Sequence, residues 1–87
     1  MKHFVVFGAG EKPNKALLAY KDEQTGMYAV NICEAENDGK YDFGDTIDME
    51  DVKGEYTTLY FAKPESLDAV ILFLKALREK WREEGQP

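Results

Sequence analysis

The sequence predicts an α+β fold, in which a four- or five-stranded antiparallel sheet carries one C-terminal α-helix packed across one face. Three observations support this prediction. Apolar residues recur at three- and four-residue steps between positions 63 and 84, which is the period of a helix. Shorter segments upstream alternate apolar and polar residues, as strands do. Gly, Asn and Asp residues separate these segments. The 87 residues are expected to form a single domain spanning 1–87.

The helix is predicted from its period and from the residues that bound it. Pro64 suits a first helical turn, where its missing N–H is not needed. Gly85 is a plausible residue just beyond the end, and Pro87 cannot extend the helix. The residues that form what we call the main apolar face are Leu67, Val70, Ile71, Leu74, Leu77 and Trp81. This face is expected to pack on the sheet.

A second, narrower line of apolar residues lies away from the main apolar face. Its members, which we call the second seam, are Ala69, Leu72, Phe73 and Ala76. They are spaced i, i+3, i+4 and i+7, so they share one side of a helix. Two interpretations remain open. A loop or a corner of the sheet covers Leu72, or a second helix packs there across a dimer, with the two alanines allowing close approach of the backbones.

Alternation and turn residues predict the strands. They are expected at residues 2–7, 15–22, 27–34, around 40–46 and 55–62, with one helical turn near 49–52. The turn at 23–26 predicts a hairpin between the second and third strands. Asn37-Asp38-Gly39 predicts a further hairpin into the fourth strand, because Asn, Asp and Gly tolerate positive φ.

The same alternation assigns side chains to the two sheet faces. The residues expected beneath the helix are Val30, Ile32, Leu59 and Phe61. The residues expected on the other face are Met27, Ala29, Cys33, Tyr56 and Tyr60. One helix can cover only one face, so this half-apolar, tyrosine-bearing face is left open. It either remains wet, as antiparallel sheets allow, or meets a partner or a second copy of the chain.

Charge is concentrated in the middle of the chain. The net charge is −6, and residues 34–55, which we call the acidic segment, hold nine acidic residues against only Lys40 and Lys53. Such a surface argues against direct binding of nucleic acid. It is compatible with a cationic partner, with a divalent cation or with simple solvation.

A weak divalent-cation site is one interpretation of the acidic hairpin at residues 34–45. The first, third, fifth, sixth and twelfth places of an EF-hand loop correspond to Glu34, Glu36, Asp38, Gly39 and Asp45. The match is imperfect, because Glu replaces Asp at the first two of these places and Asp replaces the bidentate Glu at the twelfth. The segment upstream alternates like a strand rather than a helix. A solvated hairpin is the main alternative.

No catalytic set, cofactor motif or membrane span is evident in the sequence. His3 and Ser66 are the only residues of their kinds, and Ser66 suits a helix start. Cys33 lies in a strand, where a small buried thiol is the usual finding. Gly8-Ala9-Gly10 lacks the third glycine and the following helix of a dinucleotide site. A single cysteine permits no intrachain disulfide, and no long apolar run is present, so we expect a cytoplasmic protein.

These observations lead to three functional hypotheses. The first is a non-enzymatic protein-interaction module that acts through the open sheet face, the second seam or both, and a homodimer is one form of it. The residues expected to bind the partner are Met27, Tyr56, Tyr60, Ala69, Leu72, Phe73 and Ala76. The second is a small acidic inhibitor of a nucleic-acid-binding protein, in a host-takeover or immunity setting, whose carboxylates at Asp42, Asp45 and Asp48 mimic phosphates. The third is a small enzyme of unknown class.

Overall fold

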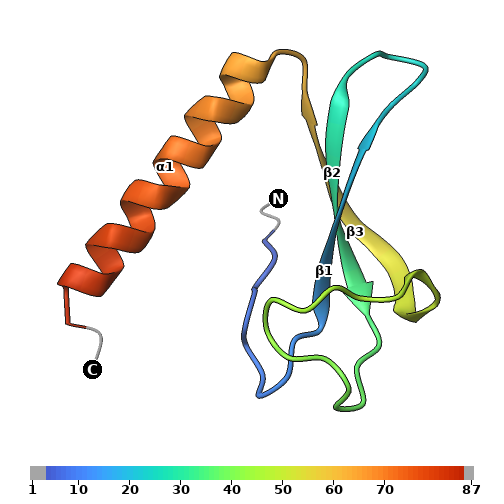
Figure 1. The fold of residues 1–87 in the computed structure, drawn as a ribbon, viewed down its shortest axis with the longest axis vertical. Helices are drawn as coiled ribbons and strands as arrows, with labels where there is room; N and C mark the ends of the chain where they lie inside the picture. The colour runs from blue at the N-terminus through green and yellow to red at the C-terminus, as the bar shows by residue number, and fades with distance from the viewer. Residues whose placement is uncertain (1–3, 86–87) are drawn as a thin grey trace.

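The structure is a computed structural model that describes residues 4–85, and it has the predicted α+β class with fewer strands than expected. Three strands and a short 3-10 turn, η1, precede one long helix (Figure 1). Their bounds are β1 Lys15–Lys21, β2 Tyr28–Ala35, η1 Met49–Asp51, β3 Val52–Phe61 and α1 Pro64–Glu83.

The sheet is an antiparallel meander in the order β1-β2-β3. The predicted hairpin between β1 and β2 is confirmed. Its turn is closed by hydrogen bonds from the backbone N–H of Asp22 to Met27 O and from that of Gly26 to Asp22 O, each 2.8 Å long. Gly26 has a φ of 75°, a conformation that glycine adopts without a steric penalty. Each strand therefore pairs only with its neighbour in sequence.

Two predicted strands are not formed. Residues 4–7 of the predicted first strand belong to no strand and pair with none, and the rest of that segment lies outside the described residues. Residues 40–46 are loop rather than a fourth strand. Apolar composition alone does not make a strand, because strand preference depends on the neighbours that a sheet supplies. Within residues 40–46, the Asn37 side chain satisfies both backbone groups of Tyr41, which are then not available to a ladder.

Strand β3 is longer than predicted, because it begins at Val52 and passes through Gly54. Two register irregularities in β2–β3 pairing, at Ile32/Cys33 and Glu34/Ala35, accompany this extension. Such bulges tolerate glycine and increase local twist. The predicted helical turn near residues 49–52 is confirmed as η1, directly ahead of β3.

Helix α1 has the predicted extent but not the predicted packing. Pro64 is at the start of α1, and Gly85 just beyond its end has a φ of 96°. Ser66 lies inside the helix rather than at its cap, a position held by Lys63. The expectation that α1 packs across one sheet face is wrong: no residue of α1 is buried, and its contacts with the sheet are few and mainly with β3. The helix leans away from the sheet (Figure 1).

The connection between β3 and α1 explains this geometry. Only Ala62 and Lys63 separate the last residue of β3 from the first of α1. Lys63 is extended, with φ −140° and ψ 144°, and Pro64 then fixes its own φ near −65°. A link this short sets the direction in which the helix departs, so α1 approaches the sheet at its first turn and diverges thereafter.

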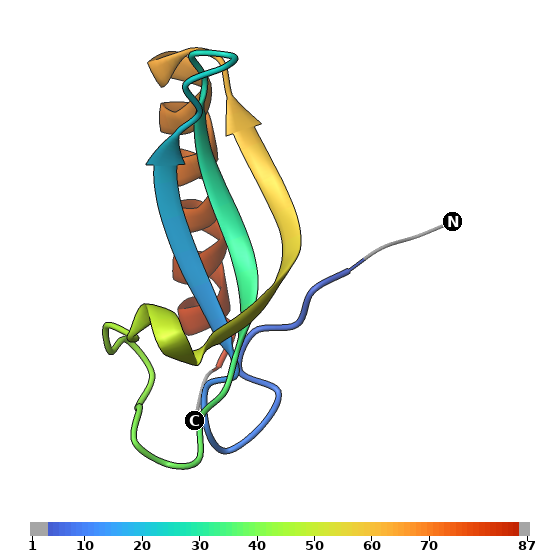
Figure 2. The same cartoon turned by 90° about the vertical axis from the view of Figure 1, so that its right-hand side faces the viewer.

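The buried core is small and lies within the sheet. The buried apolar residues are Ala16, Ala29, Ile32 and Cys33. Figure 2 shows α1 on one side of the sheet only. A three-stranded layer with one thin core has little apolar burial to stabilise it.

The core predicts a contrast between two residues that pair across β1 and β2. We expect Ile32→Ala, at a side chain only 9% exposed, to lower the free energy of unfolding by about 2 kcal/mol or more. Leu17 is the cross-strand partner of Ile32 but is 63% exposed. We expect Leu17→Ala to lower the free energy of unfolding by less than about 1 kcal/mol. Chemical denaturation measures both values. Equal losses would mean that Leu17 is as well covered as Ile32.

Candidate interaction surface

Helix α1 presents apolar side chains on two nearly opposite sides. At 100° per residue, the centres of the main apolar face and of the second seam lie about 150° apart around the helix axis. Leu72 and Phe73 of the second seam are 72% and 71% exposed, whereas exposure along the main apolar face runs from 36% at Leu67 to 64% at Trp81. The first turns of the main apolar face thus lie nearest to the sheet, and the second seam is the more exposed of the two sides.

Strand register defines which sheet face lies toward the helix. Leu67 lines a small hollow together with Tyr28 and Phe61, which are cross-strand partners. Partners directly opposite one another share a face, and this face also carries Leu17, Val30, Ile32 and Leu59. The four residues predicted beneath the helix are therefore on the helix-side face, as expected. Leu59 nonetheless remains exposed, because α1 does not close over it.

The far face of the sheet carries Tyr20 and Tyr60 on either side of buried Ala29. Next along the strands is a polar group, in which the Tyr20 hydroxyl donates to Asn31 Oδ1 at 3.4 Å and the Thr58 hydroxyl lies 2.8 Å from the same oxygen. The negative charge of a neighbouring Tyr20 phenolate, together with partial burial, raises the pKa of Tyr60. This face therefore combines two tyrosine rings with a polar centre.

Three of the residues predicted for an open apolar face lie elsewhere or are covered. Ala29 and Cys33 are on the far face but are buried, so a partner cannot reach them. Tyr56 falls within the β2–β3 register shift, and the Lys15 ammonium lies 5.3 Å from its ring centroid. Lys15 alternates with Leu17 on the helix-side face, so the bulge turns Tyr56 away from Tyr60. Met27 lies just before β2 and is half-buried.

The acidic segment folds around the side chain of Asn37. Its amide Nδ2 donates to the carbonyl oxygens of Pro13 and Tyr41, both at 2.9 Å. Its Oδ1 accepts from the backbone N–H groups of Gly39 at 3.0 Å and Tyr41 at 3.1 Å. The predicted turn at residues 37–39 is thus present, with Gly39 at a φ of 112°, but it leads into a loop rather than a hairpin.

Tyr41 joins the two ends of this loop. Its hydroxyl donates to Asp51 Oδ2 at 2.6 Å and accepts from the backbone N–H of Asp48 at 3.0 Å. The Lys40 ammonium lies 2.9 Å from the same Asp51 oxygen. The hydrogen bond from Tyr41 and then the one from Lys40 lower the pKa of Asp51, and the bond to Asp51 raises the pKa of Tyr41 and of Lys40. A neutral phenol and an ionised carboxylate therefore hold the loop closed.

Three exposed carboxylates lie on the closed loop, at Asp42, Asp45 and Asp48. Asp45 Oδ2 accepts the backbone N–H of Asp42 at 2.8 Å, which fixes that turn. Within residues 4–85, no three His, Cys, Asp or Glu side chains are grouped as a metal ion would require. Lys53 Nζ lies 2.6 Å from Glu36 Oε2 and already neutralises one of the acids placed in the EF-hand register.

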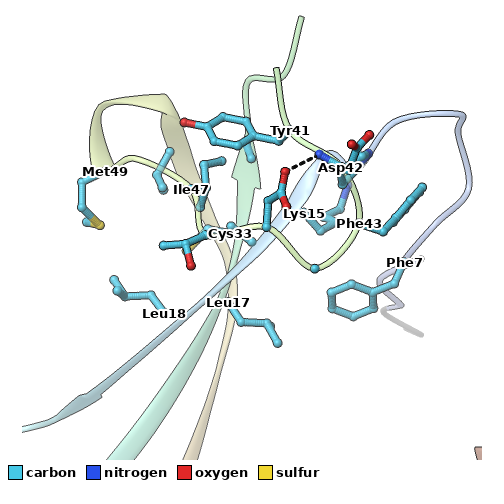
Figure 3. Close-up of a pocket in the computed structure, with 17 residues that line it drawn as sticks. Phe7, Lys15, Leu17, Leu18, Cys33, Tyr41, Asp42, Phe43, Ile47 and Met49 are labelled. Carbon is cyan, nitrogen blue, oxygen red and sulfur yellow. Dashed lines mark hydrogen bonds between the residues drawn. The ribbon is translucent and has the colours of Figure 1, made fainter. Parts of the chain in front are cut away.

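A pocket of about 520 Å³ lies between this loop and the start of β1 (Figure 3). Tyr41, Ile47 and Met49 extend toward it from the loop, Leu18 from β1, and Cys33 lies at its base. Its lining is largely apolar, and these side chains border the open space between the loop and the sheet. Sequence periodicity could not reveal this pocket, because its loop residues follow neither a helical nor a strand period.

Among residues 4–85, the other candidates for chemistry are not brought together. His3 lies outside the described residues, Cys33 is buried, and Ser66 is within α1. Gly8 and Gly10 lie in a loop ahead of β1, and Gly8 has a φ of 78°. Across the described part of the chain, no helix is both long enough and apolar enough to span a membrane.

Comparison with known proteins gives no further guide. The chain matches no family model, no curated protein and no solved structure. The arguments about function therefore rest on the surfaces described above.

The Tyr41–Asp51 contact predicts how stability depends on acidity. Because folding lowers the pKa of Asp51, its carboxylate stabilises the fold above the ordinary Asp pKa of about 4, and this contribution is lost as pH falls below that value. We expect Asp51→Asn to be less stable than the wild type at pH 7. The two unfolding free energies should converge as pH falls below about 4.

The measurement is urea unfolding across pH 2.5–7. Asp42→Asn, which alters an exposed carboxylate of the same loop, is the matched control and should leave the pH profile nearly unchanged. A constant difference between Asp51→Asn and the wild type at every pH would contradict this role for Asp51.

Proposed function

We propose that the protein is a non-enzymatic protein-interaction module and that α1 is its main binding element. The observation that carries this proposal is the exposure of apolar side chains on both sides of α1, none of which is buried against the sheet. Contiguous exposed apolar surface of this kind is uncommon on monomers and is typical of binding sites. Phe73 and Trp81 add aromatic area, which is enriched in protein interfaces.

The far face of the sheet is a secondary part of the proposed surface. Tyr20 and Tyr60 are each at least one-third exposed there and flank a polar centre. Tyrosine presents an apolar ring and a hydrogen-bonding hydroxyl together, which suits it to such a role. A non-enzymatic role is favoured because buried Cys33 has little access to a substrate and Ser66 lies in a helix.

A second candidate function is inhibition of a nucleic-acid-binding protein. It is favoured by the internal bonding of the acidic loop, in which Asn37 and Tyr41 hold Asp42, Asp45 and Asp48 in one arrangement. Carboxylates fixed in space can occupy a site that binds phosphates at a lower entropic cost than mobile ones. The partner in that case would be a basic protein.

The first function predicts that capture of a partner depends on the second seam. In a pull-down from the native host, we expect Leu72→Asp to abolish recovery of partner proteins, because a charge would be buried in the contact. Gln24→Asp makes the same change in net charge at an exposed position of the turn between β1 and β2, away from α1, and is the matched control. Binding of the recovered partner should also slow the exchange of backbone amide hydrogens in α1. Unchanged recovery of the partner with Leu72→Asp would refute the proposal.

The second function predicts that capture depends on charge in the loop. The triple variant Asp42→Lys, Asp45→Lys and Asp48→Lys should lose a basic partner and the steep salt dependence of its binding. Reversal of three exposed acids elsewhere, Glu11, Glu23 and Asp68, is the control for net charge. Equal recovery with both triple variants would rule out phosphate mimicry.

A further inference from the structure

The surface of the chain is larger than a folded monomer of its size should have. Its accessible area is 7448 Å², whereas a monomeric protein of 9.9 kDa exposes about 5,200 Å². Its radius of gyration of 14.9 Å likewise exceeds the roughly 12 Å expected for 87 residues. A standard protein interface takes about 800 Å² from each partner. The excess area of each chain is therefore more than a stable dimer needs to cover.

The second seam is centred on the middle of α1, as a symmetric contact requires. Its four residues are symmetric about the point between Leu72 and Phe73, and the midpoint of α1 lies within about one residue of that point. In a two-fold contact, the same patch meets itself around an axis through its centre. An antiparallel pair of α1 helices crossing there would use the second seam of both copies.

The antiparallel register pairs compatible residues along the whole seam. Ala69 opposes Ala76 of the second copy, which permits close approach of the backbones, and Leu72 opposes Phe73. One turn further out on the same side of the helix, Glu65 opposes Lys80, two side chains of opposite charge. Every pairing occurs twice by symmetry. A parallel pair would instead place Glu65 against Glu65 and Lys80 against Lys80.

The local surface and charge also suit a second copy. A shallow hollow lies over Ala76, where Ala69 of the opposing helix would approach; it is lined by Leu72 and by the charged side chains of Lys75, Glu79, Lys80, Glu83 and Glu84. The chain as a whole is acidic, but α1 carries four acidic and four basic residues and so has no net charge. Self-association through α1 therefore avoids the repulsion that the acidic segment would impose.

We propose that the protein forms a homodimer in which two α1 helices pair antiparallel through the second seam, with Glu65 of each copy paired to Lys80 of the other. The inference rests on the proposed function and names its partner, a second copy of this chain. In this dimer the main apolar face of α1 stays directed at its own sheet.

A charge-exchange series on the full chain tests this pairing by sedimentation equilibrium. We expect the wild type to be dimeric, and Glu65→Lys and Lys80→Glu each to raise the dissociation constant about tenfold, since each variant turns two attractive pairs into repulsive ones. The double variant Glu65→Lys/Lys80→Glu should restore the wild-type value. Residues 65 and 80 lie about 22 Å apart along one helix, so this rescue requires a second chain.

The matched control is Asp68→Lys, which makes the same charge change on α1 outside the seam and should leave the dissociation constant within about twofold of wild type. A second measurement is oxidative cross-linking: Ala69→Cys/Ala76→Cys should form covalent dimers readily, and Ala69→Cys alone should not. Cys33 is buried and does not compete.

The possible results separate this inference from the proposed function. A wild-type monomer at high concentration, or a dimer without rescue in the double variant, overturns the antiparallel pairing. Efficient cross-linking by Ala69→Cys alone does the same, because it indicates parallel helices. If the chain is monomeric and Leu72→Asp still abolishes capture of a host protein, the homodimer is wrong and the interaction module stands.

Discussion

Helix α1 is apolar on two nearly opposite sides, and a link of two residues ties it to β3. These two properties together constrain the rest of the molecule. A single sheet can cover only one side of a helix, and the extended Lys63 followed by Pro64 directs α1 away even from that sheet. The helix consequently has far more apolar surface than its own chain can bury. This unburied apolar surface is the basis of the proposed interaction module and of the proposed homodimer.

The sheet shows the same shortage of cover. Three strands form one layer, and its buried residues are mostly small. A layer of this kind needs an apolar face or a helix packed against it to be stable on its own. In this chain, the acidic loop is tied to the segment just ahead of β1 by the hydrogen bond from the Asn37 side chain to Pro13 O, while the helix-side face near Leu59 remains open. The loop is thus a structural part of the domain as well as its most charged surface.

Charge and apolar area occupy different parts of the chain. The nine acids of residues 34–55 lie on the loop and the adjoining strand ends, where Lys40 and Lys53 neutralise Asp51 and Glu36. Helix α1 has no net charge. In the proposed dimer, contact through α1 would add little repulsion between the acidic segments, because repulsion between charges more than about 10 Å apart is largely screened at physiological salt.

The sequence by itself determined the elements whose evidence is local. The period of residues 63–84 predicted α1, the turn at 23–26 predicted the β1–β2 hairpin, and alternation correctly grouped Val30, Ile32, Leu59 and Phe61 on one face. Only the tertiary structure decided which of the strand-like segments pair in the sheet and which apolar faces are covered. Residues 4–7 and 40–46 resemble strands but pair with none, a bulge redirects Tyr56, and α1 leaves its sheet uncovered. Those outcomes depend on pairing, register and chain direction between distant residues, which local periodicity does not encode.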